Sequence, residues 1–158
     1  MRGRCPVTLH SVHESSQEFD AAVHLEVSAV LVRYASGIDR RDWELFRSCF
    51  TPNCAVDYGE IGIWNGVDEI TAYMIAVHEN CGYTLHRISN VDVEAQGDAA
   101  RARSYVDAVI MGPDNRDGVR ALGFYDDRLV RSERAGWQIA QRYFTTVHVG
   151  TVGRGMPR

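Results

Sequence analysis

The sequence has few cysteines, and their spacing matches no known use. Cys5, Cys49, Cys54 and Cys81 form no Cys-x-x-Cys pair and no Cys/His pattern of a metal site. At 158 residues the chain is also longer than the small secreted domains that depend on a disulfide framework. We therefore expect free thiols, and a core that forms without disulfides or a structural metal.

Long apolar runs and an excess of basic residues are also missing. The first residues contain positive charges but no apolar stretch of a signal peptide, and no segment approaches the roughly 18 continuous apolar residues of a membrane span. The 17 basic side chains are outnumbered by 21 acidic ones, with no basic run or basic face. We predict a cytoplasmic protein without a nucleic-acid or membrane partner.

The sequence also lacks the short motifs of several enzyme classes. It has no phosphate-binding glycine loop, no metal-binding triad and no serine nucleophile elbow. We therefore expect chemistry that uses no metal and no cofactor, on a small molecule. With 45% hydrophobic and 24% charged residues the composition is that of a globular domain. We predict a flexible N-terminal arm (1–14), a single domain (15–149) and a flexible C-terminal tail (150–158).

The first half of the domain has the periodicity of helices. Ser15 and Glu18 form a capping box, and apolar residues then recur at steps of three and four, which places Tyr34 on the buried face. Gly37 is typical of a helix C-terminus, and Asp39 is typical of the N-cap of a second, short helix. The sequence therefore predicts a helical corner with Asp39 at its vertex.

The rest of the chain alternates as strands do, interrupted by one helix over residues 68–79. The connections contain the Gly, Pro, Asn and Asp residues of turns, so the long strands are expected to be antiparallel and joined as hairpins. Helices followed by strands predict an α+β fold, with three N-terminal helices on one face of a strongly bent, mostly antiparallel sheet. The expected strands cover residues 54–58, 84–94, 99–111, 119–131 and 137–149.

His86 and Asp39 are the leading candidates for proton transfer. The imidazole of a histidine has an ordinary pKa of about 6.5 and moves protons near neutral pH. An aspartate bound to it would set its tautomer and stabilise the imidazolium. Each residue also has a structural alternative, because a strand histidine is commonly a hydrogen-bonding core residue and Asp39 is a good N-cap.

Three further residues have two interpretations each. Asp107 interrupts an otherwise apolar strand, so it faces either solvent or a functional cavity. Tyr34 and Tyr58 are either core aromatics or hydrogen-bond donors to a substrate oxyanion. The cluster at 125–128 is expected to form exposed salt bridges or a subunit contact, outside the site.

The order of elements and the local sequence resemble the SnoaL-like branch of the NTF2-like superfamily, whose fold is a cone-shaped α+β barrel. The resemblance spans residues 18 to 146. It is carried by Tyr34, Asp39, Asp42, residues 50–59, Gly66, residues 68–70, His86, Ser89, Asn90, residues 123–131 and Trp137.

Within that superfamily the pattern is similar to the sites of scytalone dehydratase and the bile-acid dehydratase. The resemblance implies the catalytic residues Tyr34, Asp39, His86 and Asp107. It also implies a substrate contact for Tyr58 and a looser one for Arg142. To these we add Trp64, from a glycine-rich loop at 59–66, as a candidate substrate-binding residue.

Together these features predict a lyase that performs a dehydratase-type elimination on a small cyclic, aromatic, polyketide-like or steroid-like substrate. Two alternatives are an isomerase or cyclase in the same pocket, and a non-catalytic ligand-binding or accessory subunit of a ring-hydroxylating oxygenase. The resemblance further implies a homodimer or homotrimer, because the open face of such a sheet is commonly covered by another subunit.

Overall fold

The computed structural model describes residues 20–153. Three α-helices, α1 (Ala21–Arg40), α2 (Trp43–Arg47) and α3 (Val67–His78), come from the first half of the chain, together with the 3-10 helix η1 (Gly59–Ile61). The predicted arm (1–14) and the capping box at Ser15 lie outside the described residues. So does the end of the predicted tail, residues 154–158.

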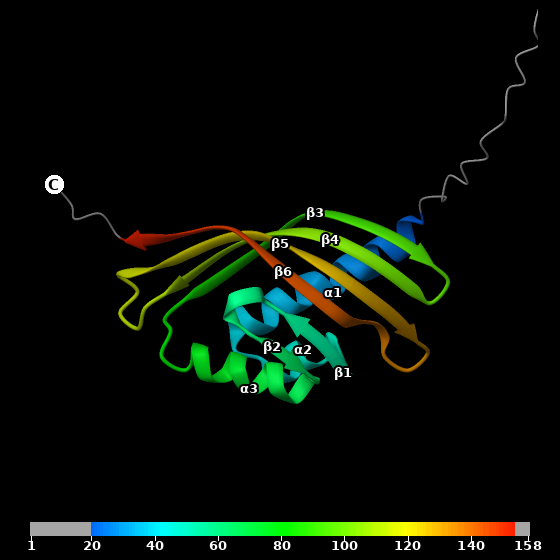
Figure 1. Ribbon diagram of the computed structural model, residues 1–158, viewed down its shortest axis with the longest axis horizontal. Coiled ribbons are helices and arrows are strands. Elements are labelled where there is room, and N and C mark those ends of the chain that lie inside the picture. Colours follow the sequence, from blue (N-terminus) through cyan, green and yellow to red (C-terminus); the bar gives the residue numbers. More distant parts are fainter. Residues whose placement is uncertain (1–19, 154–158) are drawn as a thin grey trace, which may run out of the picture.

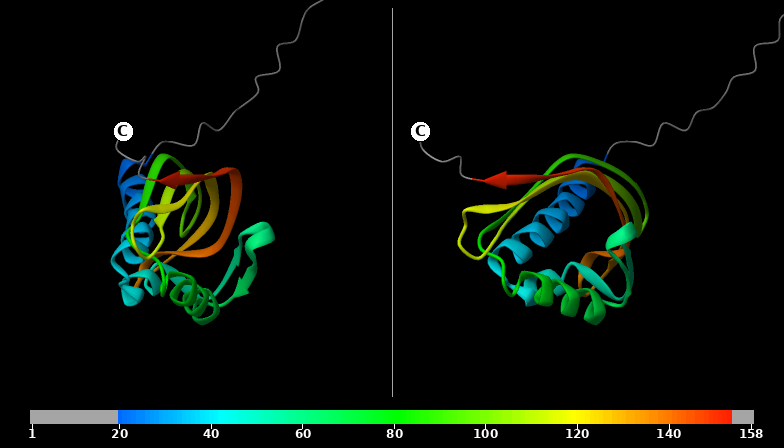
Figure 2. Two further views of the ribbon diagram at one scale, coloured as in Figure 1. Left: turned by 90° about the vertical axis from the view of Figure 1, so that its left-hand side faces the viewer. Right: turned by 60° about the vertical axis from the view of Figure 1, so that its left-hand side comes forward.

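A single six-stranded sheet follows the order β2-β1-β6-β5-β4-β3. Only the β1–β6 pair is parallel, so the sheet is mostly antiparallel as predicted. Figures 1 and 2 show β3 to β6 arching over α1, with α3 and the β1–β2 pair below the arch, on its concave side. The α+β cone expected from the sequence is therefore confirmed. The strands are β1 (Phe50–Asp57), β2 (Ile63–Asn65), β3 (Thr84–Gln96), β4 (Ala99–Met111), β5 (Asp117–Ser132) and β6 (Gly136–Gly153).

Helix α1 begins at Ala21, where the Asp20 carboxylate accepts hydrogen bonds from the backbone N–H groups of Ala22 and Val23. Its buried face includes Tyr34, as the apolar spacing predicted. Gly37 does not end the helix. A Cβ at Gly37 would lie 2.8 Å from the backbone nitrogen of Phe46, so this glycine allows α2 to pack closely against α1.

The prediction that Asp39 caps the second helix is wrong. α1 continues to Arg40 and ends at Arg41, whose φ of 58° is left-handed. The cap of α2 is Asp42, which accepts a hydrogen bond from the backbone N–H of Leu45 at 3.0 Å. Asp39 therefore lies in the last turn of α1, and its carboxylate is available for other partners.

The sheet alternates between an inner face, which covers the helices and the core, and an outer face. On β6 this alternation changes phase because Leu129 pairs with Ile139 while Arg128 pairs with Gln141, which leaves Ala140 as an extra residue. Such a β-bulge shifts every later side chain to the other face. Ile139 and Arg142 are both buried on the inner side for this reason.

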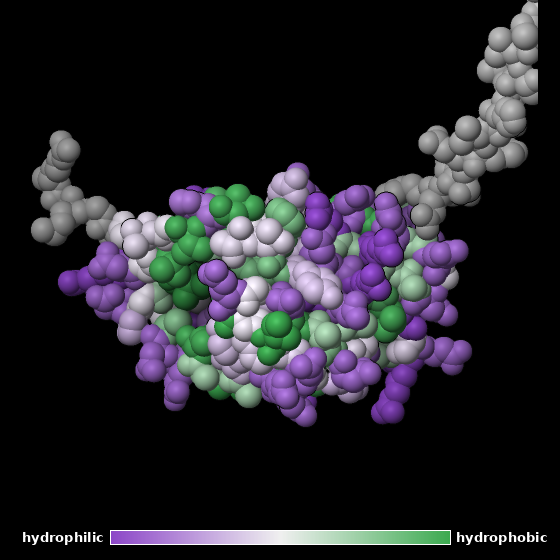
Figure 3. Space-filling model, viewed as in Figure 1, coloured by the Kyte–Doolittle hydropathy of each residue, from purple (hydrophilic) through white to green (hydrophobic). Residues whose placement is uncertain are grey.

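The outer face combines charged pairs with exposed apolar residues, among them Tyr105, Val130 and Tyr143. Figure 3 shows hydrophilic and hydrophobic residues interspersed on the side that faces the viewer in Figure 1. β6 extends to Gly153, so the predicted tail begins at least four residues too early, at 150. Burial of the outer face in a homodimer or homotrimer stays a prediction.

Candidate active site

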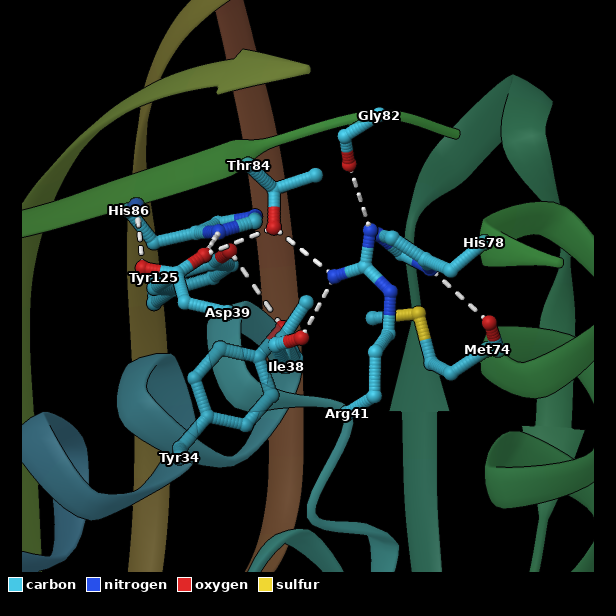
Figure 4. A network of polar contacts seen from close by, with 10 residues as sticks. All are labelled: Tyr34, Ile38, Asp39, Arg41, Met74, His78, Gly82, Thr84, His86 and Tyr125. Carbon is cyan, nitrogen blue, oxygen red and sulfur yellow. Dashed lines mark hydrogen bonds and ion pairs between the residues drawn. The ribbon is translucent and has the colours of Figure 1, made fainter. Parts of the chain in front are cut away.

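Asp39 and His86 form a hydrogen-bonded pair at the junction of α1 and β3 (Figure 4). The Nδ1 atom of His86 lies 2.7 Å from Oδ1 of Asp39, and the exposed fractions of the two side chains are 7% and 20%. Because a carboxylate only accepts hydrogen bonds, Nδ1 carries the proton in this pair. The other ring nitrogen, Nε2, is then free of a proton when the ring is neutral.

Two further donors hold the Asp39 carboxylate in place. The backbone N–H of His86 donates to Oδ2 at 2.9 Å, and the Thr84 hydroxyl donates to Oδ1 at 3.0 Å. Burial acts to raise the pKa of Asp39, but the hydrogen bonds from the His86 side chain and backbone outweigh it and hold the pKa below its ordinary value. Asp39 is therefore a fixed anion that can stabilise an imidazolium at His86.

Arg41 stabilises the same junction of α1 and β3 through further hydrogen bonds. Its Nη1 donates to the Ile38 carbonyl at 2.7 Å and to the Thr84 hydroxyl at 2.9 Å, and its Nη2 donates to the Gly82 carbonyl at 3.0 Å (Figure 4). The left-handed backbone of Arg41 turns the chain out of α1 while its side chain bridges to β3. The geometry of the pair is thus supported by a second layer of hydrogen bonds.

His86 lines an apolar cavity of about 150 Å³ inside the cup formed by the helices and the inner sheet face. Most of its wall is hydrocarbon or aromatic, and the polar groups among its lining residues are two imidazoles and four phenols. A few polar groups in an apolar cavity are typical of a small-molecule site. The lining residues are Tyr34, Tyr58, Ile61, Tyr73, Met74, Val77, His78, His86, Val106, Ala108, Ile110, Ala121, Tyr125 and Phe144.

Three tyrosine hydroxyls meet in the cavity wall. The hydroxyl of Tyr34 lies 2.7 Å from that of Tyr58 and 3.5 Å from that of Tyr125. Burial raises the pKa of all three phenols, so they remain protonated near neutral pH. The cluster can therefore donate a hydrogen bond to an oxygen atom that develops negative charge in the cavity.

A buried ion pair supports this cluster. Arg142 donates from Nε and Nη2 to the two oxygens of Asp127, both at 2.7 Å, and its guanidinium lies 4.1 Å from the ring centre of Tyr34 and 4.0 Å from that of Tyr125. Burial disfavours the charge, but the Asp127 carboxylate holds the pKa of Arg142 above its ordinary value. The positive charge also acts to lower the pKa of both phenols against the effect of burial, which favours their role as donors.

Asp107 was predicted to be catalytic, and its position contradicts this. It faces the outer side of β4, where Arg120 binds it at 2.8 Å through two nitrogens and Arg87 binds it at 3.0 Å. The hydrogen bond from Arg120 is the main cause that holds the pKa of Asp107 below its ordinary value. On the same strand Val106 and Ala108 face the cavity, so the alternation of β4 turns Asp107 away from it.

Two predicted substrate-binding residues lie behind the cavity wall. Arg142 is fully buried and does not line the cavity, because Tyr34 and Tyr125 cover it. Trp64 does not line it either. It packs against the rings of Tyr58 and Tyr73, with centroids at 5.6 and 4.2 Å, and thus supports two lining residues.

Sequence reasoning missed three polar lining residues, Tyr73, His78 and Tyr125. Tyr125 was placed in an exposed cluster, but Tyr125 and Asp127 face inward while Asp126 faces outward and binds Arg103. The alternation of side chains along a strand, applied to residues 125–127, was the signal that could have placed Tyr125 and Asp127 on one face and Asp126 on the other. His78 ends α3 one residue after Val77, and its spacing of four from Met74 places it on the same helical face.

Other hollows on the surface do not gather such groups. One of them, of about 670 Å³, is wide, contains no histidine and is lined partly by charged side chains, including Glu94, Arg101 and Arg128. Between residues 20 and 153 no group of three or more His, Cys, Asp or Glu side chains could hold a metal ion. The smaller cavity is therefore the best candidate for the site.

The fold and this cavity define a class of small α+β cup proteins with an Asp–His pair inside. Residues 20–143 match the SnoaL-like domain family, and the chain belongs to that family. It is 32% identical to the uncharacterized protein Rv2910c of Mycobacterium tuberculosis over 126 residues, which covers 77% of this chain and 83% of the relative.

Two solved structures share the fold. A candidate scytalone dehydratase from Novosphingobium aromaticivorans superposes with a TM-score of 0.75 and 20% identity, over 86% of this chain and 90% of the other. A type 2 hexachlorocyclohexane dehydrochlorinase (LinA) superposes with a TM-score of 0.75 and 13% identity, over 84% and 90% of the two chains. At these identities the likeness establishes the architecture alone.

Proposed function

We propose that this protein is a cofactor-independent lyase that carries out a dehydratase-type elimination on a small cyclic substrate. The observation that carries the proposal is the 2.7 Å hydrogen bond between Asp39 and His86 at an apolar cavity. The names of two proteins with this fold, a candidate scytalone dehydratase and a dehydrochlorinase, both denote eliminations and support the proposal.

In the proposed reaction, Nε2 of His86 removes a proton from the carbon next to a substrate carbonyl. Asp39 stabilises the imidazolium that forms, as the orienting carboxylate does in hydrolase triads. The carbonyl oxygen gains negative charge and accepts a hydrogen bond from the tyrosine cluster, through the hydroxyl of Tyr34 or Tyr58. The C–O bond to the leaving hydroxyl then breaks, and the proton on His86 is returned to that hydroxyl, so that water leaves and a conjugated double bond remains.

The size of the cavity narrows the substrate class. A cavity of about 150 Å³ matches the volume of the engineered cavity that accommodates benzene. A single six-membered ring therefore fits the enclosed part, and a larger polyketide-like or steroid-like substrate would have to extend beyond it. This size favours a monocyclic compound, or one ring of a larger molecule, as the reacting group.

The test uses 3-hydroxycyclohexanone as a probe, since it is one ring with a hydroxyl in the β position to a carbonyl. The expected product is the conjugated ketone, whose mass is lower than that of the probe by one water. His86→Ala and Asp39→Asn should each lower turnover by at least ~100-fold, the usual contribution of a general acid–base. Asp107→Asn is the matched control and should leave turnover unchanged. Near-normal rates in both dyad variants would refute the assignment.

The same dyad would also serve an isomerase or cyclase. The mass of the product separates the isomerase from the lyase, because an isomerisation loses no water and leaves the mass unchanged. Deuterium uptake from heavy water at the carbon next to the carbonyl would report proton removal by His86 in either case. The cavity argues against a non-catalytic accessory subunit, because a subunit that binds no substrate needs no cavity and its interior would be filled by packed side chains.

A further inference from the structure

His78 is a second imidazole in the cavity wall, and the proposed reaction does not use it. It lies in the last turn of α3, lines the cavity and is 7% exposed. Figure 4 shows it on the opposite side of the Arg41 guanidinium from His86. The two imidazoles thus reach the cavity from different elements, His86 from the sheet and His78 from the helical layer.

The tautomer of His78 is set by its own helix. Nδ1 lies 2.8 Å from the Met74 carbonyl oxygen, which can only accept, so Nδ1 carries the proton. Nε2 is buried and has no hydrogen-bond partner among residues 20–153. Burial lowers the pKa of His78 and the charges of Arg41 and His86 act in the same direction, while the Met74 carbonyl opposes them. His78 is thus a neutral ring with an unused acceptor.

A buried acceptor without a partner is costly, and native proteins rarely leave one unpaired. Among the polar groups that line the cavity, the phenols can donate to a ligand, and Nε2 of His86 is reserved for proton removal in the proposed reaction. The unpaired nitrogen of His78 complements a ligand that brings its own donor. A hydroxyl is the smallest such donor on a ring that fits about 150 Å³.

We propose that Nε2 of His78 accepts a hydrogen bond from a hydroxyl group of the ligand, so that the cavity selects monocyclic compounds with a free hydroxyl. The proposal deepens the proposed function by naming a feature of its substrate, and it rests on that function for the identity of the site. It concerns binding alone and requires no turnover.

The test compares two probes of one ring: phenol, which has a hydroxyl donor, and anisole, in which a methyl group blocks it. Calorimetric titration of the wild type should show phenol bound about 3- to 10-fold more tightly than anisole, the usual net value of one hydrogen bond. In nitrogen NMR of histidine-labelled protein, phenol should shift the Nε2 signal of His78 and anisole should not.

His78→Phe removes the acceptor and keeps a planar ring, so it should bind phenol and anisole equally. His78→Gln returns an acceptor oxygen and should restore part of the preference. His148→Phe, at an exposed position of β6 outside the cavity, is the matched control and should retain the preference. If His78→Phe does not fold, the NMR titration of the wild type decides alone. Equal binding of phenol and anisole to the wild type overturns the proposal, as does a preference that survives in His78→Phe or is lost equally in His148→Phe.

Failure of this proposal and failure of the proposed function can be told apart. If His86→Ala and Asp39→Asn keep full turnover while His78→Phe loses the phenol preference, the catalytic assignment fails and the binding assignment stands. If the dyad variants lose turnover while phenol and anisole bind equally to the wild type, the reverse holds.

Discussion

Asp126 and Asp127 are neighbours in β5, and each binds one arginine through two hydrogen bonds of 2.7 Å. Asp127 faces inward, where it and Arg142 are 1% and 0% exposed, whereas Asp126 and its partner Arg103 on the outer face are 40% and 54% exposed. Residue types and distances are the same, and only the face of the sheet differs. The face decides whether an ion pair supports a site or lies in solvent.

The same contrast separates Asp39 from Asp107. Both are carboxylates with a pKa held below its ordinary value by hydrogen-bonded partners. Asp39 binds an imidazole that lines a cavity, and Asp107 binds two arginines on the outer face. His86 and Arg87 are consecutive residues of β3, yet one belongs to the site and the other to the surface. A lowered carboxylate pKa therefore indicates a functional site only when the partner of the carboxylate lines the cavity.

The largest expected effect separates the two arginine pairs. Asp127→Ala leaves the Arg142 charge buried without its partner and should lower the free energy of unfolding by about 3–5 kcal/mol. Asp126→Ala, the matched outer variant, should scarcely change the urea midpoint because solvent replaces the lost partner. Urea denaturation followed by circular dichroism measures both. Equal losses in the two variants would show that the face of the sheet does not control the strength of the pair.

The next effect concerns tyrosines on the two faces. Tyr34→Phe removes the central hydroxyl of the buried cluster and should lower turnover by about 100-fold, as for loss of one oxyanion donor. Tyr105→Phe removes a hydroxyl from a side chain on the outer face that is 50% exposed, and turnover should not change. Steady-state kinetics with an active probe provide the measurement. A comparable loss in Tyr105→Phe would mean that the outer face also takes part.

The smallest effect is a pH dependence of stability that originates at His78. Its pKa is lowered by burial, so the unfolded chain binds this proton more readily than the folded one. The stabilising contribution is therefore complete above the ordinary pKa of about 6.5 and is lost as the pH falls through the lower pKa of the folded state. Melting temperatures from pH 8 to pH 5 should fall less steeply in His78→Gln than in the wild type.

His148 provides the control for this measurement, because its side chain is exposed on β6. His148→Gln should reproduce the pH profile of the wild type. If removing His78 leaves the profile unchanged while removing His148 flattens it, the buried imidazole is not the source of the pH dependence.

Much of the fold was predictable because its signals are local. The helical spacing through Tyr34 and the alternation of Thr84, His86 and Ile88 each follow from the periodicity of one element. That alternation placed Thr84, His86 and Ile88 on one face of their strand without showing which face is the inner one, and the family resemblance implied that His86 acts with Asp39. The cap of the second helix was misjudged because Asp39 and Asp42 are both good N-caps, and packing of α1 on α2 selected Asp42.

The sequence by itself determined the class of fold, the order of its elements and the inward direction of Tyr34. Only the tertiary structure decided the direction of Asp107. β4 has apolar residues on both faces at this point, so its sequence pattern does not show which face points inward. The tertiary structure also decided the position of Arg142, since the bulge at Ala140 reverses the alternation of β6 through pairing with β5. Which side chains share a cavity depends on register and packing between distant segments, and local periodicity does not contain that information.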